Sequence, residues 1–367
     1  MNQGVLLAPR TTLKTGGAAE YFCRAESEKE IANAVTFART KNLPVFVLGG
    51  GSNVLVSDEG FAGVVIQIET KGILYDPPAG EAGEKGGADV FVRAAAGVSW
   101  DSFVANTVSH GLSGVENLSG IPGSVGAAPI QNIGAYGAES KDTIESVRAL
   151  DMRTLTEKIF SNTECRFGYR DSFFKSLEGK NFIVLEVTFK LSKEPKPNIS
   201  YKDLKEYFKT EKKEDDFRAR SLSEAHKREN YALFSKSLSA TNIRSAVIEI
   251  RSKKFPDLSK VGTAGSFFKN PVISQEHFDK LKKKYPELPF FAAKNGVKVP
   301  LAYILDKICG LKGFKKGNVE LFQNQPLVLV NTGSATAKEI RDFSAEIKKA
   351  VKEKTDIDIE EEVVFVS

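Results

Sequence analysis

The chain has 367 residues, of which 41% are hydrophobic and 27% are charged. This composition is typical of a soluble globular protein with two or three domains. The formal net charge of +5 suits an acidic small-molecule ligand and is too small to favour nucleic acid as a partner. Three cysteines and three histidines without metal-ligand spacing predict free thiols in a reducing compartment and no metal site. With no signal peptide and no membrane-length apolar run, we expect a cytoplasmic protein that does not bind a membrane.

The first unit is predicted to be β-α-β. A short strand is expected at 21–24, and the capping-box spacing of Ser27 and Glu30 starts a helix whose apolar residues recur along one face. Further strands are expected at 45–48 and 64–68.

A glycine turn follows the strand at 45–48, and it consists of Gly49, Gly50, Gly51, Ser52 and Asn53. Successive N–H groups in such a turn form an anion nest suited to phosphate. The turn is not the dinucleotide-binding fingerprint, because its sixth position is a valine and the following residues read as a strand. A tight hairpin is the competing interpretation.

The glycine segment, Asn117 to Ala138, carries no charge and is too rich in glycine for an ordinary helix or strand. Its main-chain N–H groups are suited to a diphosphate or to the edge of a flat heteroaromatic ring. A buried, irregular crossover between two sheets explains the same composition, and the residues alone leave both interpretations open.

The rest of the chain alternates between predicted strands, helices and loops. The charge-dense stretch 209–230 is nearly neutral overall, which predicts a solvated helix or linker close to a domain transition and argues against a nucleic-acid arm. The other predicted elements are a loop at 75–89, strands at 90–95, 144–150, 155–160, 182–191, 326–330 and 357–366, and helices at 99–110, at 239–251, from Pro300 and after the capping box at Thr336.

Two polar residues stand in unusual surroundings. Arg170 lies among aromatic residues, where a guanidinium can be held rigidly and make a forked contact with a carboxylate; a surface pair with Asp171 is the alternative. Ser266 lies between a glycine and two phenylalanines, so a dry pocket can present its hydroxyl. No histidine follows at a useful spacing, which argues against a hydrolase nucleophile, and a simple turn residue is the alternative.

The acidic run at 360–362 lies in the predicted last strand. Alternation predicts Glu360 and Glu362 on one face and Glu361 on the other. An inward-facing glutamate is costly unless it is paired or used, and a solubilising run at a sheet edge is the alternative.

Five stretches together resemble the UDP-N-acetylenolpyruvoylglucosamine reductase family, in its type I form. The resemblance runs nearly end to end, and five motifs in the correct order are highly specific. The motifs are LGGGSNVLV at 48–56, SGIPGSVGAAPIQNIGAYGAE at 119–139, CRFGYRDSFFK at 165–175, AGSFFKNP at 264–271 and IEEEV at 359–363.

The resemblance implies an α+β fold with a two-part FAD-binding domain of the vanillyl-alcohol-oxidase (PCMH) type and a smaller α/β substrate-binding domain. The implied limits are 1–245 for the FAD-binding domain, 246–355 for the substrate domain, and 356–367 for a C-terminal strand that returns to the first part. The stretch at about 206–235 is longer and more charged than is usual in the family.

The resemblance also implies the chemistry. Hydride passes from NADPH through bound FAD to the methylene carbon of an enolpyruvyl sugar nucleotide. Arg170 stabilises the negative charge at the neighbouring carbon, Glu362 is its partner, and Ser266 delivers the proton.

The cofactor and substrate residues carry over from the same motifs. The residues implied to contact FAD are Gly49, Gly50, Gly51, Ser52, Asn53, Gly120, Ile121, Pro122, Gly123, Gly126, Ala127, Gln131, Asn132, Gly134, Ala135 and Tyr136. The residues implied to contact the nucleotide sugar are Tyr201, Arg251, Lys254, Asn270 and Gln325.

We expect a monomer with no nucleic-acid partner. The competing functions are another FAD-dependent oxidoreductase of the same fold, such as a lactone or alcohol oxidase, and a nucleotide-sugar-binding protein without catalysis.

Overall fold

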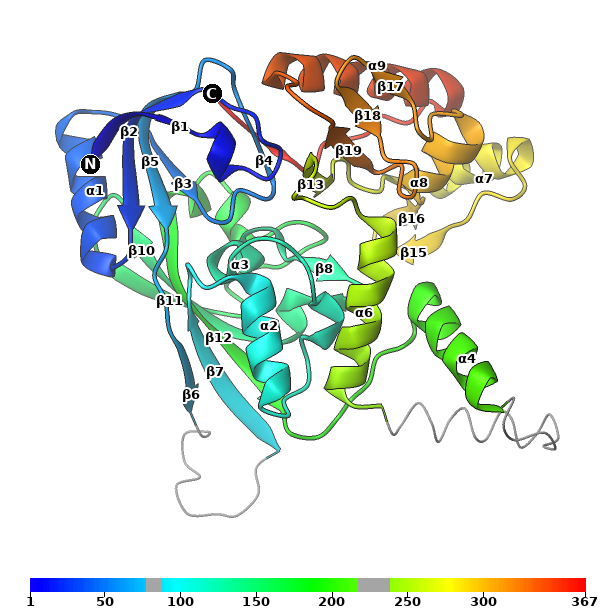
Figure 1. Ribbon diagram of the computed structural model, residues 1–367, viewed down its shortest axis with the longest axis horizontal. Coiled ribbons are helices and arrows are strands. Elements are labelled where there is room, and N and C mark those ends of the chain that lie inside the picture. The colour runs from blue at the N-terminus through cyan, green and yellow to red at the C-terminus, as the bar shows by residue number, and fades with distance from the viewer. Residues whose placement is uncertain (77–87, 217–237) are drawn as a thin grey trace.

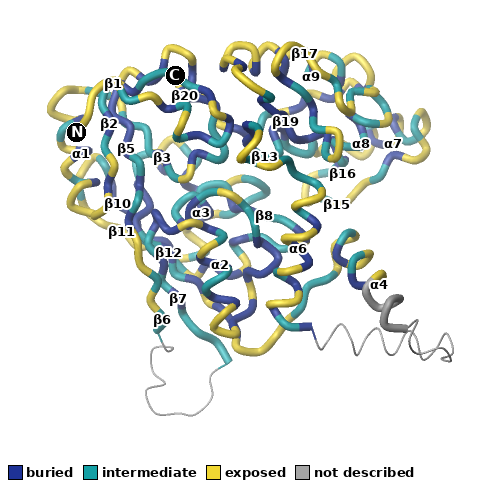
Figure 2. The backbone as a smooth tube through the Cα atoms, in the orientation of Figure 1, coloured by how far each residue is buried: buried dark blue, intermediate teal, exposed yellow. Residues whose placement is uncertain are grey.

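The computed structural model describes residues 1–76, 88–216 and 238–367 (Figure 1). The interior of the loop predicted at 75–89 and most of the charged stretch 206–235 lie outside the described residues. Buried residues line the strands and the inner faces of the helices, whereas the outer faces of α1 (Glu28–Thr40) and α9 (Ala337–Thr355) are exposed (Figure 2).

The N-terminal sheet contains the predicted β-α-β unit. Its strand order is β1-β2-β5-β3, with β2, β5 and β3 parallel and β1 antiparallel to β2. Ser27 and Glu30 form the predicted capping box at the start of α1. The elements are β1 (Asn2–Leu6), β2 (Ala18–Ala25), α1 (Glu28–Thr40), β3 (Val45–Leu48) and β5 (Phe61–Ile68).

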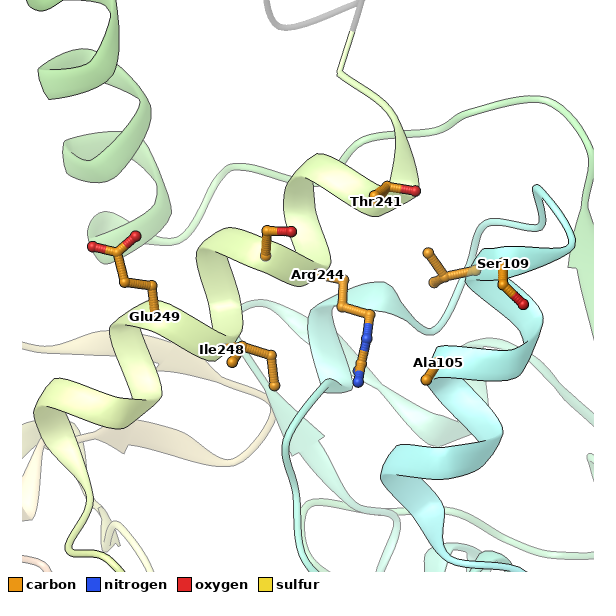
Figure 3. A pocket seen from close by; sticks show the side chains of 8 residues that line it. Ala105, Ser109, Thr241, Arg244, Ile248 and Glu249 are labelled. Carbon is orange, nitrogen blue, oxygen red and sulfur yellow. The ribbon is translucent and has the colours of Figure 1, made fainter.

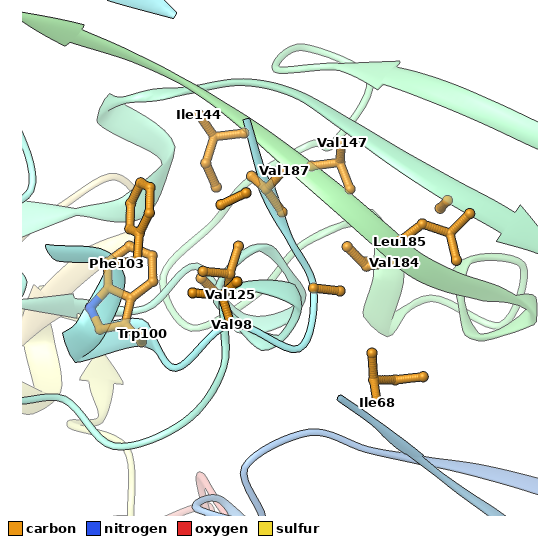
Figure 4. Packing of buried hydrophobic residues seen from close by; sticks show 14 of the residues in the cluster. Ile68, Val98, Trp100, Phe103, Val125, Ile144, Val147, Val184, Leu185 and Val187 are labelled. Atoms are coloured by element: carbon orange, nitrogen blue, oxygen red, sulfur yellow. The ribbon is translucent and has the colours of Figure 1, made fainter. Parts of the chain in front are cut away.

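The central sheet is antiparallel, with the order β11-β10-β12-β7-β6. Helix α2 packs Trp100 and Phe103 against Phe189 of this sheet, and the ring centroids of Phe103 and Phe189 are 4.5 Å apart. Figure 4 shows this core, which also includes Val125 of the glycine segment. The elements are β6 (Ile73–Asp76), β7 (Asp89–Ala95), α2 (Trp100–Ser109), β10 (Ile144–Asp151), β11 (Glu157–Ser161) and β12 (Phe182–Ser192).

The glycine segment crosses the central region in short pieces, as its composition predicts. It contains two 3₁₀ turns, α3 (Ala128–Gln131), and the paired β8 (Gly134–Ala135) and β9 (Ala138–Glu139). Asn132 and Tyr136 adopt left-handed backbone angles there, which are uncommon outside glycine.

Two helices pack beside the glycine segment. α4 (Lys202–Asp216) and α6 (Ala240–Lys254) share a small core with Tyr136. The predicted domain limit at residue 246 falls inside α6, which runs continuously through it. The domain limits therefore remain a prediction.

The C-terminal sheet has the order β13-β19-β18-β17 and is covered by α9. A second small sheet has the order β14-β16-β15. The helix predicted from Pro300 has only one α turn, α8 (Leu301–Tyr303), and continues as a π-helix over Ile304–Ile308. The remaining elements are β13 (Gly262–Ser266), β14 (Val272–Ile273), α7 (Gln275–Lys284), β15 (Phe291–Ala293), β16 (Gly296–Lys298), β17 (Lys315–Lys316), β18 (Val319–Leu321), β19 (Val328–Asn331) and α9 (Ala337–Thr355).

The chain end returns to the first part of the molecule (Figure 1). β20 (Val364–Val366) pairs in parallel with β4 (Val54–Val56), directly after the glycine turn. The strand predicted at 357–366 is therefore wrong for 357–363. That stretch is irregular, because isolated contacts with residues 267–269 hold its main chain in place of a continuous ladder.

Candidate active site

The glycine turn and the glycine segment lie against each other. A Cβ atom on Gly50 would come within 2.8 Å of the Cα of Gly123, and one on Gly49 within 2.6 Å of the Ser124 hydroxyl. The Ser52 hydroxyl donates to the carbonyl of Pro122 at 2.9 Å. Two motifs far apart in the sequence therefore form one main-chain surface, and only glycine permits so close an approach.

The glycine segment has a core side and an accessible side. Leu118, Val125 and Ile133 are buried, whereas Ile121 and Ile130 are of intermediate exposure. Small residues of intermediate exposure make up much of the accessible side, and they are Gly120, Gly123, Gly126, Ala127, Gly134 and Ala135. This small-residue surface fits a large flat cofactor better than it fits a crossover buried on both sides.

Asn53 ties three parts of the chain together. Its side-chain amide donates to the Gln131 side chain at 2.6 Å and to the carbonyl of Glu362 at 3.1 Å. Its own carbonyl accepts from the N–H of Val364 at 3.0 Å. Asn53 and Gln131 thus hold the C-terminal segment on the glycine surface.

The side chain of Asn132, a residue predicted to contact the cofactor, is occupied by other parts of the protein. It is fully buried, and its amide donates to Glu139 and to the carbonyl of Gly168, each at 2.9 Å. Its oxygen accepts from the N–H of Lys141 at 3.0 Å. With its side chain occupied inside the protein, Asn132 supports the neighbouring turn.

Arg170 and Glu362 form the ion pair at the centre of the site. The Arg170 Nε lies 2.8 Å from Glu362 Oε1, and the side chains are 19% and 11% exposed. Arg170 Nη2 also donates to the carbonyl of Gly134 at 2.7 Å. The partner of Arg170 is therefore Glu362 rather than Asp171. Burial raises the pKa of Glu362, although Arg170 beside it acts to lower it.

The three glutamates of the acidic run point to three different places, so the predicted alternation is wrong. Glu360 is 76% exposed and pairs with Lys269 at 3.0 Å. Glu361 contacts Lys348 at 3.0 Å and Ser344 at 3.1 Å, and only Glu362 turns into the site. Alternation requires extended strand geometry, and these residues are not in a strand.

Ser266 ends β13 beside this pair. The next residue, Phe267, accepts at its carbonyl from the N–H of Glu362 at 2.8 Å. Phe267 and Phe268 are both buried, as expected for a dry surrounding. Within the described part of the chain, the half-buried Ser266 hydroxyl makes no hydrogen bond, so it is free to donate.

The basic residues predicted for the substrate lie along α6. Arg251 donates from Nε to the carbonyl of Gly120 at 3.0 Å. Lys254 pairs with Asp203 of α4 at 2.5 Å, an acidic partner that was not among the predicted site residues. Arg251 therefore links α6 to the glycine segment, whereas Lys254 links α6 to α4.

Tyr136 and Tyr201 meet edge to face, with ring centroids 5.4 Å apart. Tyr201 is 44% exposed, and burial raises the pKa of Tyr136 to about 12. Tyr136, predicted to contact the cofactor, thus lies next to residues predicted to contact the substrate.

Asn270 and Gln325 are both partly exposed. The Asn270 side chain accepts from the N–H of Leu301 at 2.9 Å. Gln325 lies in the turn before β19, which is the strand paired with the end of β13. The neighbouring Asn324 donates to the carbonyl of Lys253 at 2.9 Å, which ties this turn to the end of α6.

A separate pocket of about 500 Å³ lies between α2 and α6. Figure 3 shows Arg244 between the two helices, with Ile248 and Ala105 nearby. Arg244 holds Asp101 at 2.5 and 2.9 Å, and Asp101 accepts from the N–H of Gly120 at 2.6 Å. This pocket has no residue in common with the predicted site, but Asp101 supports the first glycine of the surface.

Among residues 1–76, 88–216 and 238–367, no group of histidine, cysteine or acidic side chains is placed to hold a metal ion. In the same residues, no helix has the length and apolar character needed to cross a membrane.

Two family models match the chain. They are described as "FAD binding domain", at residues 19–156, and "UDP-N-acetylenolpyruvoylglucosamine reductase, C-terminal domain", at residues 257–366. The UDP-N-acetylenolpyruvoylglucosamine reductase of Ralstonia nicotianae is 37% identical over 98% of this chain and 97% of its own. That of Flavobacterium johnsoniae is 38% identical over 94% and 93%.

The solved structure of UDP-N-acetylenolpyruvylglucosamine reductase from Thermus caldophilus is also similar. It superimposes with a TM-score of 0.62 and 24% identity, and the match covers 100% of this chain and 98% of that one. This likeness confirms the predicted α+β fold.

Proposed function

Because the chain belongs to the UDP-N-acetylenolpyruvoylglucosamine reductase family, we propose that it reduces UDP-N-acetylglucosamine enolpyruvate to UDP-N-acetylmuramate with NADPH. The chain is an oxidoreductase, as the names of its relatives state, and its proposed product makes it an enzyme of peptidoglycan precursor synthesis. We further propose that it works in the cytoplasm as a monomer.

The match to an FAD binding domain and the accessible glycine surface support FAD as the resident cofactor. Residues 49–53 and 120–136 would hold it, through main-chain donors and with few side chains in the way. When bound and reduced by NADPH, the flavin supplies the hydride that the enol methylene carbon receives.

Arg170 is proposed to stabilise the charge that develops on the substrate. Hydride addition to the methylene carbon leaves an electron pair on the neighbouring carbon, shared with the substrate carboxylate. The Arg170 side chain is preorganised by Glu362 and by the carbonyl of Gly134, so it needs little rearrangement during the reaction. Fixed charge of this kind is commonly the largest single contribution to catalysis.

Ser266 is proposed to complete the reduction by giving its hydroxyl proton to that carbon. The C–H bond forms as the O–H bond breaks, and solvent returns a proton to the serine oxygen. The free hydroxyl of Ser266, adjacent to Phe267 and its contact with Glu362, supports this role.

Arg251 and Lys254 are proposed to bind the substrate diphosphate, with Tyr201 covering it and Asn270 and Gln325 lining the pocket. Lys254 already pairs with an acidic group, the Asp203 carboxylate. A diphosphate would take the place of that carboxylate, so binding is expected to weaken as salt rises.

The single observation that carries the proposal is the meeting of Arg170, Glu362 and the end of β13 beside the glycine surface. An anaerobic titration followed by flavin absorbance tests it. NADPH added first should bleach a yellow protein, and the enolpyruvyl sugar nucleotide added second should restore the colour.

Each alternative predicts a different result. A lactone or alcohol oxidase would be reduced by its own substrate, and its colour would not return with the sugar nucleotide. A nucleotide-sugar-binding protein without flavin would be colourless throughout.

A further inference from the structure

The carbonyl of Arg170 is held by Lys175, a residue to which the proposed function gives no role. Lys175 Nζ donates to this carbonyl at 2.8 Å. The side chain is partly buried, and this burial lowers the pKa of its ammonium group. A charged amine is costly to bury without compensation, and the contact with Arg170 supplies it.

Lys175 extends from a rigid base. It ends a 3₁₀ helix, Phe173–Lys175, that is capped by Ser172, and the Ser172 hydroxyl donates to the carbonyl of Ile130 at 2.7 Å. The rings of Phe173 and Phe174 are buried against Phe160. The main chain of Lys175 is thus fixed both to the core and to the glycine segment.

The turn that Lys175 supports is strained. Arg170 has φ = +53°, a left-handed conformation that is rare for a residue with a long side chain. Such a conformation persists only where its surroundings fix it. Asn132 holds the turn at the carbonyl of Gly168, and Lys175 holds it at the carbonyl of Arg170.

Lys175 also contributes charge at Glu362. This carboxylate faces Arg170 from the turn, Lys175 from the 3₁₀ helix and Lys269 from the residues after β13, and all three cations lower its pKa. Of these cations, Lys269 pairs with the exposed Glu360, whereas Lys175 contacts Arg170 itself.

We propose that Lys175 is a positioning residue for the reduction step, holding Arg170 in the conformation that aims its guanidinium at Glu362 and the substrate. The proposal rests on the proposed function, because it assigns Arg170 to the chemistry on the sugar nucleotide.

The test compares K175M, K175R and K269M as full-length, flavin-loaded proteins. In K175M, we expect reoxidation of the flavin by the sugar nucleotide to slow about 10²-fold, as small misplacements of catalytic groups do, while reduction by NADPH keeps its rate. K175R keeps a cationic donor and should recover most of the loss. K269M removes a neighbouring charge without touching Arg170 and should keep the wild-type rate at its pH plateau.

The protonation of Glu362 provides a second readout, independent of turnover. An infrared band of the protonated carboxyl, assigned by its loss in E362Q, should titrate at higher pH in K175M and in K269M than in wild type. K175M and K269M should therefore both raise the pKa of Glu362, but only K175M should slow flavin reoxidation at the pH plateau. This difference separates the positioning of Arg170 from the effect of the lost charge.

Equal plateau rates in K175M and K269M would overturn the proposal, and so would equal rates in K175M and K175R. If K175M does not retain flavin, K175Q takes its place under the same criteria. Should wild-type enzyme itself fail to reoxidise with the sugar nucleotide, the proposed function falls and the role of Lys175 in the reduction step falls with it; a wild-type enzyme that reoxidises while K175M matches K269M overturns the role of Lys175 alone.

Discussion

Arg170 and Glu362 form a largely buried ion pair, with 2.8 Å between Nε and Oε1, although they lie far apart in the sequence. Arg170 lies in a turn beside the glycine segment, and Glu362 lies in the segment that returns the chain end to β4. Their contact therefore depends on the assembly of the whole molecule. Removing one partner of such a pair leaves an uncompensated charge, so each substitution here needs a readout that separates chemistry from folding.

Arg170→Lys is the sharpest test of the guanidinium. Lysine cannot contact Glu362 and the carbonyl of Gly134 together, because it lacks the planar fork. We expect flavin reoxidation by the sugar nucleotide to slow about 10²–10³-fold, with bound flavin retained. Stopped-flow absorbance measures the rate, and R166K, which changes a neighbouring exposed arginine, is the matched control. A protein purified without flavin would mean that Arg170 is structural.

Ser266→Ala should affect only one half of the reaction. The hydroxyl is proposed to act after hydride transfer, so reduction by NADPH should keep its rate. Reoxidation by the sugar nucleotide should slow about 10²–10⁴-fold, as expected for the loss of a general acid. Single-turnover measurements of both halves check this, with S259A as a control at an exposed serine. Equal slowing of both halves would contradict the assigned role.

Gly50→Ala tests the glycine surface. The added Cβ would lie 2.8 Å from the Cα of Gly123, which is main chain and cannot swing aside. Overpacking costs about 1–3 kcal/mol, so flavin affinity should fall about 5–150-fold. Fluorescence titration of the apoprotein with FAD measures the affinity. In G333A the Cβ would keep ordinary distances, the nearest atom being 3.6 Å away, and flavin affinity should stay at the wild-type value.

The sequence predicted most regular elements because their signals are local. The capping box at Ser27 and the apolar spacing of the following helix lie within a few residues, and the structure has both. The same holds for Thr336 and α9. The candidate site was predicted from motif resemblance, which identified Arg170, Ser266 and Glu362 but did not indicate their contacts in the folded protein.

Contacts between residues that lie far apart in the sequence could not be predicted from local sequence patterns. The orientation of the glutamates at 360–362 follows from contacts with residues 267–269 rather than from a strand period. The pair of Lys254 with Asp203 depends on how α4 packs against α6. The side-chain contacts of Asn132 with Glu139 and with the carbonyl of Gly168 likewise join residues that its own motif does not link.

Arg244→Met should weaken the dependence of the free energy of unfolding on pH in the acidic range. The Arg244 guanidinium holds the pKa of Asp101 below its usual value, against the opposing effect of burial. A group with a lowered folded pKa stabilises the protein above its unfolded pKa, and that stabilisation is lost as pH falls through the folded pKa. Because both side chains are partly exposed, we expect a loss of about 1 kcal/mol at neutral pH.

The advantage of wild type over R244M should therefore be largest at neutral pH and shrink as Asp101 is protonated in acid. Thermal melts of both proteins across this range measure it. K338M, which removes a more exposed pair with Asp342, should show almost no such difference. A constant gap between wild type and R244M at every pH would mean that Arg244 acts through packing between α2 and α6 rather than through the charge of Asp101.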